Sequence, residues 1–173
     1  MANVVLVVDM VRGFLEPGHN LYCGDEARTI IPNVQTLLER EKADGSAILF
    51  ISDHHDPDDL EFQIFPVHCV KGTEEPNVIP ELEAFVTDTN VIPKNRYSGF
   101  FNTDLAQRLE VLRPEKIIVC GVCTDICVLH TSADARNRDY AVEVPTDCVA
   151  SFNADAHAWA LGHLQKILGA KVV

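Results

Sequence analysis

The sequence lacks any linker, internal repeat or low-complexity tract that would divide it into parts. No run rich in glycine, serine or proline interrupts its 173 residues, of which 47% are hydrophobic and 23% are charged. That composition is typical of an ordinary globular protein, and the length is sufficient for one sizeable hydrophobic core. We therefore expect a single domain that spans residues 1–173.

Basic residues are scarce. The chain has 14 Lys and Arg against 26 Asp and Glu, which gives a formal net charge of −12. Neither a basic stripe nor a basic amphipathic helix is visible, and this argues against nucleic acid or an anionic membrane as a partner. The N-terminus lacks the basic and long apolar regions of a signal peptide, and no apolar run could span a bilayer. We expect a cytoplasmic protein with reduced cysteines.

Short hydrophobic runs alternate with segments of helical periodicity. The run at residues 4–8 has no polar alternation, which is typical of a strand buried on both faces. Strands are expected at 4–8, 47–51, 90–93, 116–120, 141–144 and 170–173, and helices at 25–44, 78–86, 104–112, 124–138 and 153–168. The alternation predicts an α/β fold, a single doubly wound and mainly parallel sheet with helices on both faces, in a Rossmann-like three-layer α/β/α arrangement.

The stretch from Lys116 to Ala135 reads as strand, tight turn and helix. Residues 116–120 are rich in β-branched side chains, Gly121 is expected to turn the chain, and Thr124 begins the helix. Cys127 then falls in the first helical turn. Unpaired backbone N–H groups and the helix dipole favour a thiolate there, and the thiolate is the nucleophilic form of cysteine.

Three cysteines within eight positions allow other interpretations. The pair Cys120 and Cys123 has redox or metal spacing, but a thioredoxin-like pair starts its helix, whereas Cys120 ends a strand. A zinc ribbon would need a second pair of ligands at similar spacing, and none follows. We interpret Cys120 as buried and structural, Cys123 as a turn residue and Cys127 as the reactive one. The alternative for Cys127 is a small core hydrophobe.

Polar groups follow the carboxyl ends of four expected strands. They are Asp9, the pair Asp53 and His55, Lys94, and Cys127. Taken singly, each has an ordinary explanation as a cap, a loop residue or a solvated surface group. Sites in doubly wound sheets form outside the carboxyl ends of the strands, near the point where strand order reverses. Together these residues therefore predict one site.

Five blocks in chain order carry a family pattern across nearly the whole chain. The last is specific, because Gly-Val-x-Thr-Asp-x-Cys-Val at a strand-to-helix turn is rarely seen elsewhere. On these blocks the chain resembles the isochorismatase-like cysteine hydrolases and, among them, the nicotinamidases. The blocks are Val-Val-Asp9-Met-Val-Arg-Gly-Phe14, Ser-Asp53-His54-His55, Phe65-Pro-Val-His68-Cys-Val-Lys-Gly-Thr73, Pro-Lys94-Asn-Arg-Tyr-Ser-Gly-Phe100 and Gly121-Val-Cys-Thr-Asp-Ile-Cys127-Val-Leu-His-Thr-Ser-Ala-Asp-Ala135.

The resemblance implies that Asp9, Lys94 and Cys127 form a catalytic triad. Lys94 and the helix N-terminus would hold Cys127 as a thiolate that attacks an amide carbonyl. Asp9 would relay protons to the departing ammonia and from the hydrolytic water. The family's oxyanion donors are backbone N–H groups, which fall here on Cys123 and Cys127, with a cis peptide bond between Val122 and Cys123.

The resemblance to nicotinamidases also implies a divalent metal ion. Asp53, His55 and His68 match the family's Asp-x-His…His pattern, and Glu61 is a candidate fourth ligand. His54 stands beside His55, so the choice between the two histidines stays open at this stage. Carboxylate and imidazole ligands favour zinc, with iron or manganese as alternatives. Isochorismatase and the N-carbamoyl amide hydrolases of the family work without a metal.

The leading hypothesis is a nicotinamidase that converts nicotinamide to nicotinate and ammonia through a cysteine thioester, as in NAD salvage, with pyrazinamide as a further substrate. Phe14, Phe65 and Tyr97 resemble the aromatic walls that enclose the pyridine ring. One alternative is a metal-free amidase for another amide or carbamoyl compound. Another is a thiol or zinc-binding protein without turnover. Isochorismatase is disfavoured because its dianionic substrate suits a basic pocket. The family resemblance also implies a homo-oligomer.

Overall fold

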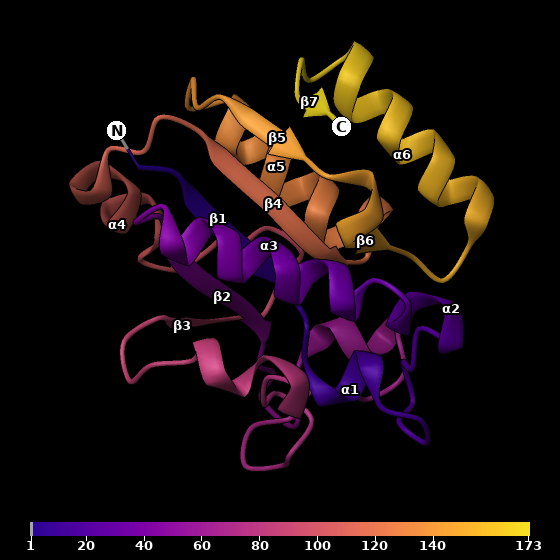
Figure 1. Cartoon of the computed structure of the whole chain (residues 1–173). Helices are drawn as coiled ribbons and strands as arrows, with labels where there is room; N and C mark the ends of the chain where they lie inside the picture. Colours follow the sequence, from indigo (N-terminus) through magenta and orange to yellow (C-terminus); the bar gives the residue numbers. More distant parts are fainter. Residues whose placement is uncertain (1) are drawn as a thin grey trace.

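The computed structural model describes residues 2–173 as a parallel sheet packed between helices. The strands are β1 (Val4–Val8), β2 (Ala47–Asp53), β3 (Val91–Lys94), β4 (Ile117–Val122), β5 (Val142–Val144), β6 (Val149–Ala150) and β7 (Lys171–Val172). Their order is β3-β2-β1-β4-β5-β7, with β6 also paired to β4, and these strands all pair in parallel. The chain runs outward from β1 to β3 and returns to the other side of β1 as β4 (Figure 1). The predicted doubly wound α/β fold is confirmed.

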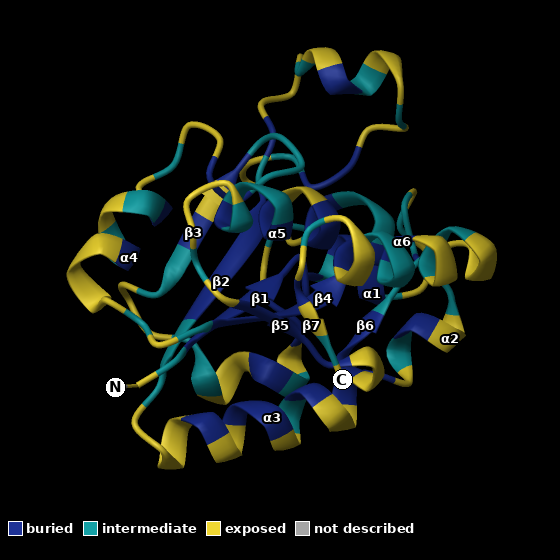
Figure 2. Ribbon diagram, turned by 90° about the horizontal axis from the view of Figure 1, so that it is seen from above, coloured by how far each residue is buried: buried dark blue, intermediate teal, exposed yellow. Residues whose placement is uncertain are grey.

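Helices cover both faces of the sheet (Figure 2). The α-helices are α1 (Arg12–Leu15), α2 (Asp25–Arg28), α3 (Ile31–Ala43), α4 (Leu105–Leu112), α5 (Leu129–Arg136) and α6 (Ala154–Lys166). Figure 2 shows α3 below the sheet and α5 above it, and α4 and α6 contribute side chains to the same core as α5. All five residues of β1 are buried, and its side chains alternate between two cores. Val5 and Val7 join the core under α3, whereas Val4, Leu6 and Val8 join the core under α4 and α5.

The prediction of a single helix at 25–44 is wrong in one respect, because the segment forms two helices, α2 and α3. Residue Pro32 lies in the first turn of α3. Proline has no backbone N–H and restricts the residue before it, so it is tolerated at a helix start but disrupts a helix interior. The segment expected as a helix at 78–86 is a 3-10 helix, η2 (Pro80–Phe85), which also begins at a proline.

Several short elements were not predicted: α1, β6, η1 (Leu60–Gln63) and η4 (Thr146–Cys148). Each has four residues or fewer, so none shows a hydrophobic period. Strand ends also differ from expectation, because β2 and β3 extend to Asp53 and Lys94 themselves. These two side chains are consequently held by strand backbone and not by loops.

Gly121 does not turn the chain, contrary to expectation. It lies inside β4 with φ +112°, paired with Val8 of β1. A Cβ atom built on it would lie 2.0 Å from the carbonyl oxygen of Val8. Glycine is thus required both by the positive φ and by the close approach of β1. The change of direction follows instead at the Val122–Cys123 peptide bond, which is cis, as the family resemblance implies.

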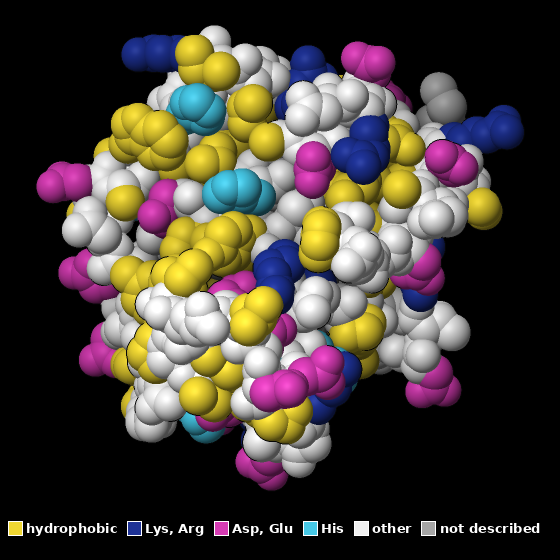
Figure 3. Space-filling model, turned by 180° about the vertical axis from the view of Figure 1, so that it is seen from behind, with side chains coloured by type: hydrophobic (Ala, Val, Ile, Leu, Met, Phe, Trp, Pro, Cys, Tyr) yellow, Lys and Arg dark blue, Asp and Glu magenta, His cyan; other side chains and the backbone are white. Residues whose placement is uncertain are grey.

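The surface agrees with an acidic chain that has few basic residues. On the face seen in Figure 3, Lys and Arg occur singly among acidic and hydrophobic side chains. Within residues 2–173, no helix combines the length and the apolar character needed to cross a membrane.

Replacing Gly121 with alanine should destabilise the protein by about 3 kcal/mol or more, because the added methyl group collides with the β1 backbone. Gly162→Ala is the matched control, since a Cβ there meets no atom within 4 Å and the residue lies inside α6. Alanine at 162 should be neutral or stabilising by up to about 1 kcal/mol. Urea unfolding followed by circular dichroism measures both, and equal stability of the two variants would contradict the steric argument.

Candidate active site

Three neighbouring strands deliver the first group of polar side chains to one edge of the sheet. Asp53 and Lys94 are the last residues of β2 and β3 and are register partners. Asp9 follows β1 with φ 51°, and its backbone N–H donates to the carbonyl of Ile51 (2.7 Å). The backbone N–H of Asp53 in turn donates to Asp9 Oδ1 (2.9 Å). The parallel register therefore brings together three residues that lie more than 40 positions apart in sequence.

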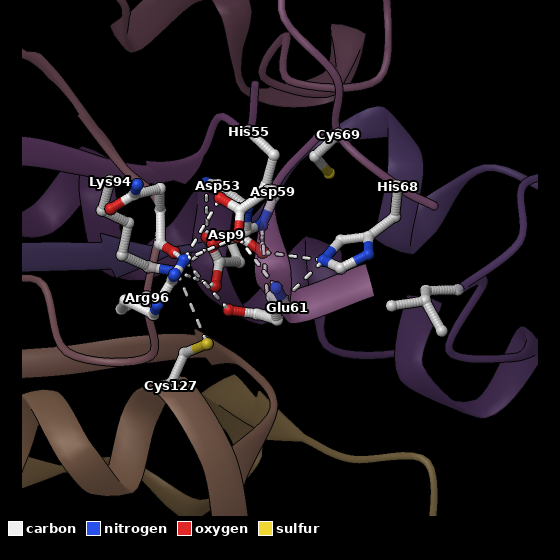
Figure 4. Close-up of polar contacts among 12 residues, drawn as sticks. Asp9, Asp53, His55, Asp59, Glu61, His68, Cys69, Lys94, Arg96 and Cys127 are labelled. Atoms are coloured by element: carbon white, nitrogen blue, oxygen red, sulfur yellow. Dashed lines mark hydrogen bonds and ion pairs between the residues drawn. The ribbon is translucent and has the colours of Figure 1, made fainter. Parts of the chain in front are cut away.

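Lys94 is at the centre of this group (Figure 4). Its Nζ lies 3.0 Å from Asp9 Oδ2, forms a short contact with Asp53 Oδ1, and donates to Cys127 Sγ at 3.5 Å. The Lys94 side chain is fully buried, as is nearly all of Asp9. Figure 4 shows Cys127 reaching toward the ammonium from the opposite wall. The structure thus brings the three residues of the predicted triad together.

The charges of this group oppose a preformed thiolate. Burial and the nearby Asp9 and Asp53 carboxylates raise the pKa of the Cys127 thiol well above its usual value, although Lys94 opposes the shift. Burial also raises the pKa of Asp9 to about 6, against the influence of Lys94. The sequence argument considered Lys94 and the helix N-terminus, whereas the structure adds two carboxylates that disfavour the thiolate. Two carboxylates contact the Lys94 ammonium, and their negative charges offset much of the stabilisation that the ammonium would give a thiolate.

Cys127 lies in a wide helical turn at the end of β4. A π-helical segment, η3 (Thr124–Val128), precedes α5, and the N–H of Val128 donates to the Cys123 carbonyl (3.1 Å). Cys123 stands between the cis bond and this turn. Both Cys123 and Cys127 line the same pocket. Cys120, by contrast, is fully buried inside β4, where its thiol donates to the carbonyl of Leu6 (3.7 Å).

A second group of buried side chains adjoins the first. The ligand atoms of Asp53, His55, Glu61 and His68 all lie within 4.8 Å of one another. Asp53 Oδ2 is 3.3 Å from His55 Nε2 and 3.4 Å from His68 Nε2. Glu61 Oε1 is 4.0 Å and 3.8 Å from the same two nitrogens. His55 therefore belongs to the group, whereas the neighbouring His54 is not part of it. The backbone N–H of His54 donates to the carbonyl of Lys94 (2.7 Å).

This donor set fits a divalent metal ion. Separations of 3.3 to 4.0 Å allow each atom to lie about 2.0–2.2 Å from one ion. Glu61 Oε2 is buried, and no hydrogen bond to it is found within residues 2–173. Burial and the neighbouring Asp53 raise the pKa of Glu61, and hydrogen bonds and charge from Asp53 raise the pKa of His55 to about 9 against the effect of burial. Because a metal ion binds the deprotonated forms of these ligands, ion binding and proton binding would compete at this cluster.

Two residues that the sequence did not point to orient the cluster. Asp59 Oδ2 lies 2.9 Å from His55 Nδ1, and Arg96 donates to Asp59 Oδ1 (2.8 Å). The carboxylate fixes the ring so that Nε2 faces Asp53 and Glu61. His68 is held similarly, through Nδ1 and the carbonyl of Pro66 (2.7 Å). The spacing of four between His55 and Asp59 was the available signal, but it lies in an irregular loop where spacing does not determine direction.

A pocket with about 350 Å³ of empty space opens onto both groups. Phe14, Phe65 and Tyr97, the aromatic residues expected from the resemblance, all line it. Its wall also includes three residues that the sequence did not predict: Leu21, Ile126 and Phe152. Asp9, Asp53 and Glu61 contribute carboxylates, and no Lys or Arg is found among the lining residues that the structure describes. Such a pocket favours a small, flat, neutral molecule over a dianion.

Comparison with known proteins places these features in a family. Residues 3–173 match the family model described as the isochorismatase domain. The structure is similar to that of nicotinamidase PncA from Bacillus subtilis, at 34% sequence identity and a TM-score of 0.92, covering 100% of this chain and 99% of that chain.

Two further solved structures bear on the metal and the substrate. A pyrazinamidase of Pyrococcus horikoshii in complex with zinc is 29% identical with a TM-score of 0.89, covering 100% of this chain and 99% of that one. N-carbamoylsarcosine amidase from Thermoplasma acidophilum is 30% identical with a TM-score of 0.86, covering 99% and 95% respectively.

Replacing Asp59 with asparagine should weaken zinc binding by about 10- to 100-fold, because the neutral side chain no longer holds the His55 ring as a charged acceptor. The control is Asp56→Asn in the same loop, where the carboxylate is exposed and pairs with Lys71. Competition with a zinc-sensitive chelator measures both affinities. Wild-type affinity in Asp59→Asn would contradict an orienting role for this carboxylate.

Proposed function

Because the chain belongs to the isochorismatase family and is a cysteine amidohydrolase, we propose that it is a nicotinamidase, which hydrolyses nicotinamide to nicotinate and ammonia. The observation that carries this proposal is one pocket with three components. Asp9 and Cys127 form one part of its lining, and Asp53, Glu61 and His68 form a second. The rest is aromatic and aliphatic, and it includes Phe14, Phe65 and Tyr97. A pyridine ring with one ring nitrogen and one carboxamide matches each component.

Cys127 is the proposed nucleophile and Asp9 the proposed proton carrier. As the sulfur attacks the carboxamide carbon, the thiol proton passes to Asp9, whose pKa of about 6 suits both accepting and releasing a proton. Collapse of the tetrahedral adduct breaks the C–N bond, and Asp9 gives its proton to the departing ammonia. Water then attacks the thioester, and Asp9 accepts a proton from that water. As the C–S bond breaks, Asp9 returns the proton to the sulfur, and the acid that forms loses its own proton to solvent, which leaves carboxylate and free thiol.

Lys94 is proposed to stabilise the negative charge that moves from Asp9 to the sulfur when the thiol proton is transferred. Its ammonium touches both groups, and its pKa is raised well above the usual value because Asp53 and Asp9 outweigh the effect of burial. It therefore stays charged throughout the cycle. The backbone N–H groups of Cys123 and Cys127 are the proposed donors to the oxyanion, since both residues line the pocket beside the nucleophile.

Asp53, His55, Glu61 and His68 are proposed to hold zinc, the ion in the Pyrococcus horikoshii neighbour. When bound, the ion would supply a Lewis acid that takes the pyridine nitrogen and so orients the ring. The chain itself supplies these four ligands. Burial alone would raise the pKa of Asp53, but Lys94 and the two histidines outweigh it and keep the carboxylate ionised.

A second candidate is a carbamoyl amidase, which the Thermoplasma acidophilum neighbour favours. The two candidates make different demands on the four-residue cluster, since an amidase for carbamoyl compounds would not use a ring nitrogen ligand. NAD salvage and the further substrate pyrazinamide belong to the nicotinamidase proposal.

Purified protein should release ammonia from nicotinamide and pyrazinamide faster than from N-carbamoyl amino acids. Cys127→Ala should lower kcat by at least about 10⁴-fold, because the thioester can no longer form. Ammonia release is measured with a coupled assay, and the zinc content of the variant is measured alongside it as a control for the fold. Carbamoyl turnover without nicotinamide turnover would replace the proposal with the second candidate.

Removing the metal with a chelator should abolish nicotinamide turnover, and added zinc should restore it. His68→Ala should have the same effect as chelation, because its Nε2 is one of the four converging atoms. His54→Ala is the matched control and should retain activity within about threefold, since His54 lies outside the cluster. Metal analysis by mass spectrometry accompanies the rates. Full activity in metal-free protein would rule out the metal's proposed role.

A further inference from the structure

Two thiols that the proposed reaction does not use lie against each other. Cys23 Sγ and Cys123 Sγ are 3.7 Å apart, although the residues are separated by 100 positions. Both residues are buried, with 8% and 5% of their surfaces exposed. Cys23 ends the loop after α1, and Cys123 follows the last residue of β4. The contact between the two thiols thus lies where the loop after α1 meets the turn that leads to Cys127.

The two cysteines of this pair line different hollows in the surface. Cys123 lines the substrate pocket, whereas Cys23 lines a separate open groove between α2 and residues 146–157. The pair therefore lies between these two hollows. The remaining buried cysteines have other partners: the Cys69 thiol donates to the carbonyl of Glu75 at 3.9 Å, and that of Cys148 to its neighbour Asp147 at 3.4 Å.

We propose that Cys23 and Cys123 form a reversible oxidation site whose oxidant is a hydroperoxide. One sulfur attacks a peroxide oxygen, which breaks the O–O bond, forms a sulfenic acid and releases water or an alcohol. The second sulfur then attacks the sulfenic sulfur, forms the S–S bond and releases water. Two thiols are oxidised, one hydroperoxide is reduced, and both thiol protons leave in the products. A dithiol reductant reverses the change.

Oxidation changes the geometry of the proposed catalytic groups. A disulfide has an S–S distance of about 2.05 Å, so the two sulfurs must approach from 3.7 Å. Cys123 carries a proposed oxyanion donor, and the N–H of Cys23 donates to the carbonyl of Phe14 (2.8 Å), a residue of the pocket wall. Displacement near 1 Å at a reacting centre lowers rates by up to about 100-fold. The loss of turnover rests on the proposed function, whereas formation of the disulfide does not.

The chemical step is tested in Cys127→Ala, in which the other five of the six cysteines remain. Zinc-loaded protein is treated with hydrogen peroxide, blocked with iodoacetamide under denaturing conditions, and digested without reduction. Mass spectrometry should find the peptides of Cys23 and Cys123 joined, with three cysteines alkylated. If these two peptides are alkylated separately, or if either is joined to another cysteine, the proposal is overturned whether or not the protein is a nicotinamidase.

The effect on turnover is tested in protein with Cys127 intact. Hydrogen peroxide should lower kcat at least about tenfold, and dithiothreitol should restore most of it. Cys23→Ala should lose the dithiothreitol-reversible part, whereas Cys148→Ala, which removes a similarly buried thiol, should keep it. Cys23→Val serves as a second variant if alanine destabilises the fold. A reversible loss of equal size in the Cys23 variants would overturn the regulatory consequence.

Discussion

The buried ammonium of Lys94 is the interaction on which the site depends. An ion of this size is costly to remove from water, and it is stable here because two carboxylates contact it, Asp9 at 3.0 Å and Asp53 more closely. Removing one partner of such a group typically costs about 3 to 5 kcal/mol. The strand register that places Asp53 opposite Lys94 therefore matters for stability as well as for chemistry. A slip of one residue would turn one of the two charges into a hydrophobic core.

Much of the fold could be predicted from the sequence, because its strands are hydrophobic throughout and its helices are amphipathic. The run at β1 could only be a strand buried on both faces, and it is fully buried. The predictions failed where tertiary contacts, and not the local sequence, determine the local structure. Nothing local in Gly121 distinguishes a turn from a strand residue pressed against Val8, and the two-residue strand β6 exists only through its pairing with β4.

The site was predictable to a similar extent. Strand ends and family blocks pointed to residues that the structure gathers into one pocket, and the cluster distinguishes His55 from His54. Asp59, Arg96 and Phe152 were missed because they act from loops whose direction no periodicity encodes. The thiolate at Cys127 was expected from two features, the helix N-terminus and Lys94. In the structure the thiol's state depends on a balance of three charges, and a sequence gives the residues but not their distances.

Asp53 uses both of its carboxylate oxygens for different tasks: Oδ1 contacts Lys94, and Oδ2 faces His55 and His68. A single planar group thus joins the proposed acid–base residues to the four-residue cluster proposed to bind the metal. By thermodynamic linkage, any change in ion affinity caused by the charge of Lys94 must be matched by an equal change in the proton affinity of Lys94 when the ion binds. A substitution that moves the Asp53 carboxylate would therefore disturb contacts on both sides of it.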